Sequence, residues 1–283
     1  MTRYMKVLPF KISKPENDAL IYQEDVGSYF YDKLHQHEEI QLSYIVEGEG
    51  TLIVGDTIND YKEGDTLVFG SNLPHVFKSD ANATKSSKML TLFFTESSFG
   101  EGFFHLHELN ELISFFNRTT HGFKITSNKK KISKLFLSLK GASRFERFMI
   151  LLNLLKIGST SNYMSLSSFI YQKKYTDIEG KRMRDIYEYT MSNYRKKISL
   201  EDVADIAAMT KNAFCKYFKK RTNKTYFSFL NELRIEHACK LLLDKKDYTI
   251  SEISELSGFN NISNFNRQFK AIKKKKPSEF RKT

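Results

Sequence analysis

Hydrophobic residues come in short runs separated by turn residues between about residues 20 and 95. The runs read IQLSYIV, TLIV, TLVFG and MLTLFF, with EGEG, GD and DYKEGD between them. Short runs rich in β-branched and aromatic residues, bounded by glycine and aspartate, are typical of strands joined by tight turns. The pattern predicts a meander of short strands that closes into a small barrel or sandwich.

The spacing of hydrophobic residues becomes helical after Gly102. Apolar residues recur at three- and four-residue intervals, first at Leu109, Leu112, Ile113 and Phe116 and then at Ile132, Leu135, Phe136 and Leu139. This period predicts helices through most of the remaining chain. The stretch GSTSNYMSLSS at 158–168 is rich in Gly, Ser, Thr and Asn and has no period, so it predicts a linker.

Two stretches of the chain share one pattern, VADIAAMTKNAFCKYFKK at 203–220 and ISELSGFNNISNFNRQFK at 253–270. Before the first copy, Ser199 is placed to cap a helix with Asp202 as its capping-box partner. After a short turn, Thr210 is placed to cap a second helix whose apolar side carries phenylalanines. The first copy therefore predicts a helix-turn-helix.

The second copy repeats the arrangement with Gly258 in the turn and Asn261 as the cap. Ala204 and Ser254 are small at the matched positions where two steeply crossing helices must approach. A single such pattern is equally compatible with a plain helical hairpin. Two copies in register, with basic residues on both outer faces and a predicted helix at 226–244 between them, favour DNA binding.

The distribution of charge supports a polyanion partner for the C-terminal side alone. The 283 residues, enough for two domains, carry a net charge of +12. Residues 1–122 hold 10 Lys/Arg against 18 Asp/Glu, whereas residues 123–181 hold 12 against 3 and residues 182–283 hold 23 against 12. An acidic first half is thus joined to a basic second half, which is the charge pattern of a nucleic-acid-binding domain attached to another domain.

Other classes of protein are disfavoured. The longest apolar stretch, FMILLNLL at 148–155, is too short to span a bilayer, and the first residues lack the apolar core of a secretory signal. Two cysteines, Cys215 and Cys239, cannot form a disulfide framework. We therefore expect a cytoplasmic protein with no membrane partner.

The C-terminal residues 185–281 resemble the AraC/XylS family of bacterial transcription regulators. The resemblance is carried by SLEDVADIAAMT, FKKRTNKT, LNELRIEHACKLL, ISELSGF and NRQFKAIKKKKPSEFR. Its most specific parts are the Leu-Arg-Ile-Glu-x-Ala run at 233–238, Gly258-Phe259, and Pro277 with Phe280-Arg281. The resemblance implies that each recognition helix enters a major groove, so that one chain reads successive grooves of double-stranded promoter DNA.

By position, the resemblance places seven side chains against base edges: Asn212, Cys215, Lys216, Ile262, Ser263, Asn266 and Arg267. Lysines beside and beyond the recognition helices are candidates for phosphate contacts: Lys211, Lys219, Lys270, Lys273, Lys274, Lys275 and Lys276. The resemblance also makes RNA polymerase a candidate partner. It does not choose between activation and repression.

Three residues depart from the family pattern, because Ala208, Asn223 and Lys274 stand where the family has glycine. Asparagine tolerates a left-handed backbone better than alanine or lysine does. We therefore expect these turns to be strained or to be built differently.

The stretch HQHEEIQLSYIVEGEGTLIVGD, continuing through YKEGDTLVFGSNLPHVF, resembles the cupin-type sensor domain of this family. His35, His37 and His75 stand where metal-binding cupins place histidines, but Gln41 stands at the carboxylate position, and an amide is a poor metal ligand. We expect no metal and no other cofactor. The resemblance implies instead an effector pocket for an unknown small molecule, lined by these four residues and Tyr44.

The segment SRFERFMILLNLLKI at 143–157 is a candidate dimerisation helix. Phe145, Phe148, Leu152 and Leu155 fall at three- and four-residue spacing along it. The alternative is that this face packs on its own barrel. A homodimer is the favoured interpretation.

The sequence thus predicts an α+β protein with an N-terminal cupin-like β-barrel, following helices, and a C-terminal all-α domain of two helix-turn-helix units. The expected boundaries are a sensor barrel at 1–100, a helical dimerisation segment at 101–157, a linker at 158–180 and the DNA-binding domain at 181–283. The expected function is a sequence-specific transcription regulator and not an enzyme. The alternatives are a metal-dependent cupin enzyme, with iron or zinc on the three histidines, and a nonspecific architectural DNA binder.

Overall fold

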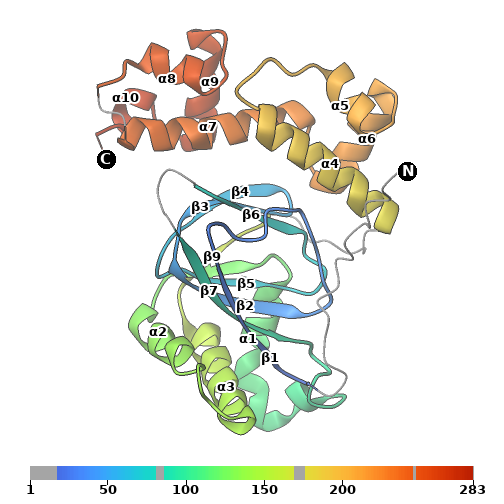
Figure 1. Ribbon diagram of the computed structural model, residues 1–283, viewed down its shortest axis with the longest axis vertical. Helices are drawn as coiled ribbons and strands as arrows, with labels where there is room; N and C mark the ends of the chain where they lie inside the picture. The colour runs from blue at the N-terminus through green and yellow to red at the C-terminus, as the bar shows by residue number, and fades with distance from the viewer. Residues whose placement is uncertain (1–17, 81–85, 169–175, 245–246, 283) are drawn as a thin grey trace. The chain divides into compact units, whose positions relative to one another are not determined.

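The computed structural model describes residues 18–80, 86–168, 176–244 and 247–282. The chain divides into two compact units, residues 1–180 and residues 181–283. Figure 1 shows that the first contains all the described strands, whereas the second is helical. We refer to them as the barrel unit and the helical unit.

Two antiparallel sheets form the barrel unit, a six-stranded sheet in the order β1-β7-β2-β5-β8-β9 and a three-stranded sheet in the order β4-β3-β6. The strands are β1 (Ile21–Gly27), β2 (Ile40–Glu47), β3 (Gly50–Val54), β4 (Thr57–Tyr61), β5 (Thr66–Phe69), β6 (His75–Ser79), β7 (Ser87–Phe94), β8 (Phe123–Ile125) and β9 (Tyr163–Ser165). The two sheets face each other, as the resemblance to a cupin predicted.

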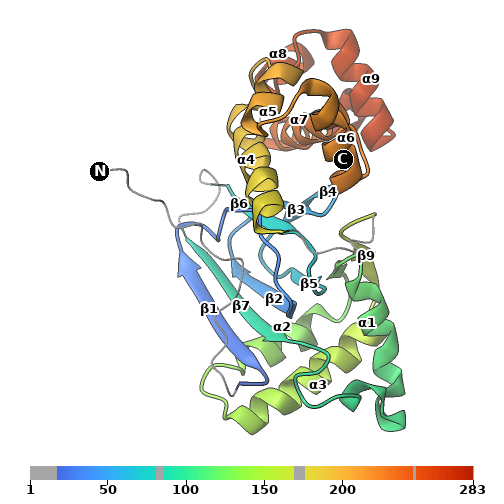
Figure 2. The same ribbon diagram turned by 90° about the vertical axis from the view of Figure 1, so that its right-hand side faces the viewer.

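The two faces of the six-stranded sheet bury different cores. On one face, Leu42 and its neighbours pack against Phe115 and Leu151 of the helices that follow the barrel. On the other face, Ile45 packs against Leu52 and Phe77 of the three-stranded sheet. Because successive side chains of a strand point to opposite faces, β2 contributes to both cores. Figures 1 and 2 show the helices on one side of the sheet.

The helices of the barrel unit are the 3₁₀ helices η1 (Phe103–His105) and η2 (His107–Leu112) and the α-helices α1 (Ile113–Thr119), α2 (Lys129–Leu137) and α3 (Arg144–Thr160). A capping box starts α3, because the Ser143 side chain accepts from the Glu146 N–H while the Glu146 carboxylate accepts from the Ser143 N–H.

Two short strands correct the sequence prediction. β8 lies inside 101–157, where only helices were expected, and β9 lies inside the expected linker. β8 pairs with β5 on one side and with β9 on the other, so both strands extend the six-stranded sheet. A strand of three residues contains too few positions to show a period of two, and its pairing partners are distant in sequence.

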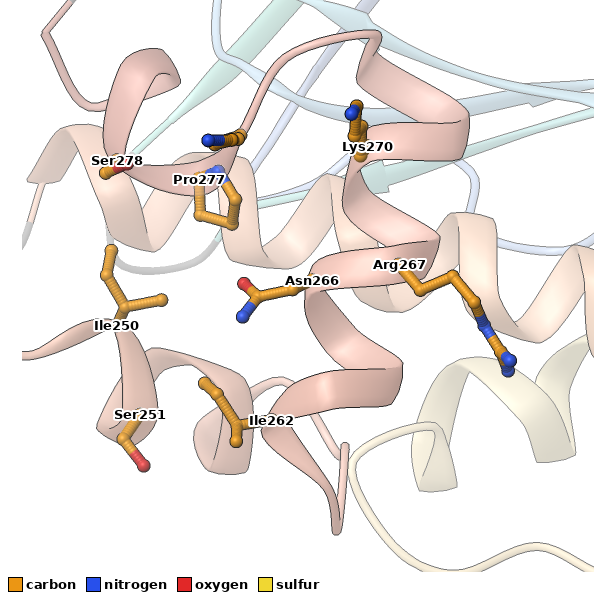
Figure 3. A pocket seen from close by; sticks show the side chains of 9 residues that line it. Ile250, Ser251, Ile262, Asn266, Arg267, Lys270, Pro277 and Ser278 are labelled. Atoms are coloured by element: carbon orange, nitrogen blue, oxygen red, sulfur yellow. The ribbon is translucent and has the colours of Figure 1, made fainter.

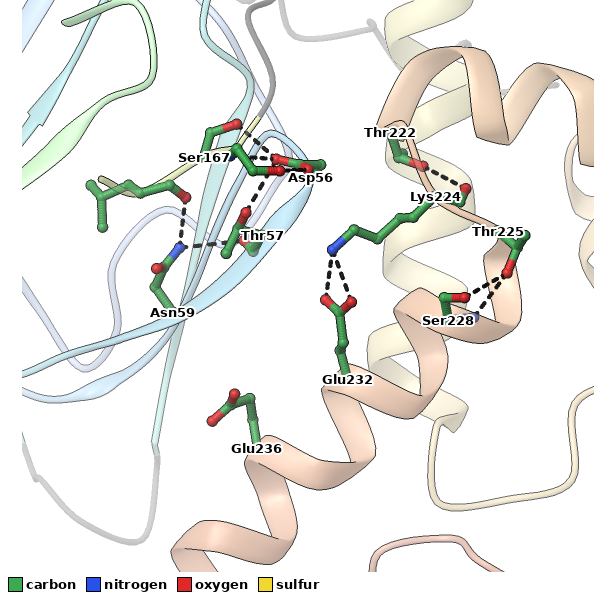
Figure 4. A network of polar contacts seen from close by, with 12 residues as sticks. Asp56, Thr57, Asn59, Ser167, Thr222, Lys224, Thr225, Ser228, Glu232 and Glu236 are labelled. Carbon is green, nitrogen blue, oxygen red and sulfur yellow. Dashed lines mark hydrogen bonds and ion pairs between the residues drawn. The ribbon is translucent and has the colours of Figure 1, made fainter. Parts of the chain in front are cut away.

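The residues 158–168 are not a linker in the structure. Gly158 and Ser159 are buried in the last turn of α3. Asn59 Nδ2 donates to the Leu166 carbonyl at 3.0 Å, and the buried Asp56 carboxylate accepts from the Ser167 hydroxyl at 2.8 Å (Figure 4). The remainder of the expected linker, residues 169–175, lies outside the described residues.

The helical unit consists of seven helices in its described residues: α4 (Asp177–Asn193), α5 (Leu200–Ile206), α6 (Lys211–Thr222), α7 (Tyr226–Asp244), α8 (Ile250–Leu256), α9 (Ile262–Lys273) and α10 (Pro277–Phe280). We refer to α5 with α6 as the first motif and to α8 with α9 as the second motif. The helix predicted at 226–244 is confirmed as α7.

The predicted caps of both motifs are confirmed. Ser199 and Asp202 form a capping box at α5, and the Thr210 side chain accepts from the Ala213 N–H at α6. Asn261 accepts from the N–H groups that start α9. Each cap satisfies backbone donors that the first turn of a helix leaves unpaired.

The three positions at which the family has glycine all adopt a left-handed backbone. The φ angles are +50° at Ala208, +56° at Asn223 and +58° at Lys274. The matched turn of the second motif has Gly258 at φ +88°. The expectation of strain is therefore confirmed for Ala208 and Lys274, whose side chains disfavour this conformation.

Candidate nucleic-acid interface and barrel interior

The outer faces of α6 and α9 are formed by the residues that the resemblance selected. Phe214 and Phe218 anchor α6, and Phe265 and Phe269 anchor α9, since all four are fully buried. The opposite face of each helix is then exposed. It carries all seven base-edge candidates: Asn212, Cys215 and Lys216 on α6, and Ile262, Ser263, Asn266 and Arg267 on α9.

Six of the seven lysines expected to contact phosphates are exposed: Lys211, Lys219, Lys270, Lys274, Lys275 and Lys276. Lys273 is the exception and corrects the prediction. Its ammonium group pairs with Glu236 of α7 at 2.5 Å, and its side chain is only 24% exposed. Lys273 therefore stabilises the contact between α9 and α7 and is not presented on the outer face.

Asn264 positions one of the base-edge candidates, and the sequence did not point to it. The Arg267 guanidinium donates to the Asn264 side-chain oxygen at 2.9 Å, across one turn of α9. This bond restrains the Arg267 side chain on the exposed face of α9. The three-residue spacing of the two side chains on one helix was the available signal.

Arg234 is a second residue whose role the sequence analysis left unexplained. Its guanidinium donates to the carbonyls of Tyr194 and Lys196 at 2.7 and 2.8 Å, and it lies over the ring of Phe259. Arg234 thus ties α7 both to the segment that follows α4 and to the turn of the second motif. Such contacts restrain the orientation of one motif relative to the other.

The Leu-Arg-Ile-Glu-x-Ala run has a packing explanation. Leu233, Ile235 and Ala238 are buried in the helical unit, and Glu236 holds Lys273. Together with Arg234, every specified position of the run makes a defined contact. These contacts explain why so short a run is specific for this arrangement of helices.

In the barrel unit, His35, His37 and His75 come together in the interior. One ring nitrogen from each lies within 4.8 Å of those of the others. The Nδ1 atoms of the three rings lie 2.8–2.9 Å from main-chain carbonyls, those of Lys33, Glu39 and Leu73. Because a carbonyl can only accept, each Nδ1 carries the proton.

The Gln41 side chain lies between two of these rings. One end of its amide is 3.0 Å from His37 Nε2 and 3.1 Å from His75 Nε2, and the other end is 2.9 Å from the Ser43 hydroxyl. Burial lowers the pKa of His37, and it lowers the pKa of His75 well below the usual value, so both rings are neutral. Neutral rings protonated at Nδ1 accept at Nε2, so the amide end that satisfies them is the NH₂ group.

This network tests whether the histidines fit a metal ion. Three imidazoles converge as cupin metal ligands do, but the Gln41 amide lies against two of their Nε2 atoms and takes the place of the carboxylate. An amide NH₂ group cannot ligate a cation. The carboxylate ligand of a metal-binding cupin is therefore missing here, and the histidines make hydrogen bonds to main-chain carbonyls and to Gln41.

We expect Gln41→Glu to create a metal site, because the variant offers three imidazoles and a carboxylate. Its affinity for Zn²⁺ should exceed that of the unaltered protein by at least roughly tenfold, since changes outside the ligand set alone alter affinity by that much. Metal content after dialysis, and the rise of the unfolding temperature on adding Zn²⁺, measure the effect. His75→Ala in the same background should abolish it. One tightly held metal ion in the unaltered protein would contradict this interpretation.

Tyr44 does not join the histidines, which corrects the predicted pocket. Its ring stacks on Phe136 of α2, and its hydroxyl donates to Ser133 at 3.1 Å. Gln41 and Ser43 point into the barrel, so strand alternation directs Tyr44 to the other face. The interior chain continues instead from Ser43 to Thr91 at 2.9 Å.

Some apolar residues of the candidate dimerisation helix α3 are buried in the barrel unit, and others are exposed to solvent. Leu155 is fully buried in the core of the barrel unit, and Phe148 packs on Phe99. Phe145 is 72% exposed and Met149 44% exposed. The four residues selected from the sequence therefore do not form one free face.

Comparison with known proteins gives two family matches. Residues 203–283 match the helix-turn-helix domain family and residues 26–92 match the cupin domain family. A relative from Bacillus subtilis, the uncharacterized HTH-type transcriptional regulator YdeC, is 25% identical over 89% of this chain and 87% of its own. An HTH-type regulator of Pseudoalteromonas carrageenovora is 35% identical over 34% of this chain and 55% of its own.

Among solved structures, ToxT from Vibrio cholerae covers 93% of this chain and 97% of its own, with 14% identity and a TM-score of 0.36. A probable AraC family transcriptional regulator from Rhodopseudomonas palustris covers 36% of this chain and 95% of its own, with 24% identity and a TM-score of 0.34. In the described parts of the chain, no helix has the length and apolar character needed to cross a membrane.

A cupin domain followed by a helix-turn-helix domain defines a DNA-binding transcription regulator. The helix-turn-helix match falls within the residues 185–281 that resemble the AraC/XylS family.

Proposed function

We propose that the protein binds specific promoter sequences through the outer faces of α6 and α9. The observation that carries the proposal is the pair of motifs, each presenting exposed polar side chains on a helix anchored by buried phenylalanines. α7 has 19 residues, so its length is about 28 Å. Successive major grooves on one face of DNA are about 34 Å apart, and a connecting helix of this length suits two recognition helices in neighbouring grooves.

We further propose that the barrel unit senses a small molecule at the histidine cluster. His37, Gln41 and His75 are buried, whereas His35 is partly exposed and contacts the exposed ring of Tyr31. An effector would enter beside His35. The polar chain from Gln41 to Thr91 would transmit its binding to β7 through hydrogen bonds.

Homodimerisation through Phe145 and Met149, the exposed apolar residues of α3, is part of the proposal. RNA polymerase is a further proposed partner. The protein is proposed to act without catalysis, because the interior histidines hold structural hydrogen bonds. A DNA-binding regulator acts where the DNA lies, so the proposal places it in the cytoplasm.

We expect residues 181–283 to bind DNA without the barrel unit, because both motifs and α7 lie within this compact unit. The expected result is retention of the same genomic DNA fragments by the isolated unit and by the full chain. Sequencing of retained fragments measures it. A folded fragment that retains no DNA, while the full chain does, would show that the interface needs the barrel unit.

A further inference from the structure

A groove runs along the outer face of the second motif, between α9 and the first turns of α8 and α10. Its volume is about 650 Å³. Figure 3 shows Asn266 projecting toward Ile250, Ile262 and Pro277, which give the groove an apolar floor. Lys270 and Lys276 supply positive charge at its edges, whereas the Arg267 guanidinium is directed away from Asn266 (Figure 3).

The lining suits the sugar–phosphate backbone of one DNA strand. None of the nine described residues that line the groove is acidic, and Ser251 and Ser278 add hydroxyl donors to the two lysines. Phosphates accept from such groups, and the apolar floor can receive a deoxyribose. Three base-edge candidates of α9, Ile262, Asn266 and Arg267, also line the groove, so base contacts and backbone contacts meet on this surface.

The first motif can be compared with the second position by position. The caps Ser199 and Thr249 correspond, as do the caps Thr210 and Asn261. The second residue of the first helix of each motif is Ser251 in α8 but Glu201 in α5. The first residue of the recognition helix is Ile262 in α9 but Lys211 in α6.

These differences between the two motifs place charged residues in the first motif where the second motif has uncharged ones. Glu201 of α5 and Lys211 of α6 form an ion pair in the first motif. A hydrogen bond from Lys211 lowers the pKa of Glu201, which is therefore charged at neutral pH. A phosphate entering here meets a carboxylate, and Lys211 must leave its partner before it can bind the phosphate.

We propose that the two motifs hold the DNA backbone unequally, with the second motif as the anchor. The Glu201–Lys211 pair occupies in the first motif the position that the backbone takes in the second. The inference rests on the proposed function. It makes Glu201 a residue that weakens backbone binding by the first motif.

Exchange of the two residues tests the proposal. Glu201→Ser gives the first motif the residue of the second, and Ser251→Glu does the reverse. On a random-sequence duplex, Glu201→Ser should tighten binding by roughly fivefold, the effect of one unit charge a few ångström from a phosphate in water. The log–log salt slope should steepen by about one as Lys211 gains a phosphate. Ser251→Glu should weaken binding by a similar factor.

Asp244→Ser is the matched control, because it removes one negative charge from the same unit at the end of α7, outside both outer faces. Glu201→Gln is a second variant that retains an acceptor for Lys211 but removes the charge, and it should also tighten binding. Circular dichroism verifies that each variant is folded. The inference would be overturned if Glu201→Ser and Asp244→Ser bound the random duplex with equal affinity. It would also be overturned if folded Ser251→Glu bound that duplex as tightly as the unaltered protein does. Absence of DNA binding by the unaltered chain would instead overturn the proposed function.

Discussion

Replacing Gly258 with alanine is expected to destabilise the helical unit by about 2–5 kcal/mol. Gly258 has φ +88°, where a residue with a Cβ atom costs about 1–2 kcal/mol. A Cβ atom would also lie 2.6 Å from the Tyr194 carbonyl oxygen and 2.9 Å from the Arg195 Cα. Both are backbone atoms that cannot rotate away, and forced displacement in a packed region costs about 1–3 kcal/mol. Amide hydrogen exchange of residues 181–283 in the full chain measures the loss.

The first motif offers the matched control. Ala208 occupies the corresponding turn at φ +50° and already carries a Cβ atom. Ala208→Gly should relieve strain and stabilise the unit by about 1 kcal/mol or less, because glycine also raises the entropy of the unfolded chain. Equal and small effects of the two substitutions would show that the turns tolerate side chains alike and that Gly258 is not a point of close approach.

Replacing Arg267 with alanine is expected to cost about 1–3 kcal/mol on a cognate site and little on random DNA. Arg267 is exposed on α9, and its bond to Asn264 holds the guanidinium on the outer face. Its forked donors can pair with two acceptors of a guanine in the major groove. Binding to cognate and random duplexes across a salt series measures the difference.

The lysines beyond α9 should behave differently from Arg267. Neutralising Lys274 and Lys275 should weaken binding to both DNAs alike and flatten the salt dependence by about one unit of log–log slope for each phosphate that is no longer neutralised. Lys274→Asn suits the left-handed backbone at this position. If Arg267→Ala lowers both affinities equally, then Arg267 contacts a phosphate and does not read a base.

Much of the helical unit could be predicted from the sequence because its signals are local. A cap such as Ser199 acts on N–H groups within three residues, and Phe265 and Phe269 lie one turn apart. The left-handed turns were also predictable, since glycine at a family position reports the backbone that the position requires. The exposed faces follow once the buried faces are known.

Tyr44 was misplaced although strand alternation determines its direction, but the other errors concern contacts between residues distant in sequence. β8 and β9 form strands because an existing sheet edge pairs with them, and Asp56 holds Ser167 from more than a hundred residues away. Lys273 resembles its neighbouring lysines in sequence, yet Glu236 of another helix determines its direction. The local sequence pattern could identify neither Asp56 as the partner of Ser167 nor Glu236 as the partner of Lys273.

The ratio of affinities for specific and random DNA at one salt concentration shows whether the protein is a sequence-specific regulator. DNA fragments selected by the protein from its own genome provide the specific sites. We expect binding at least roughly a thousandfold tighter to a selected site than to a random duplex, with protection in two patches about one helical turn apart. A ratio near one, with uniform protection, would contradict sequence-specific regulation and indicate a nonspecific architectural DNA binder.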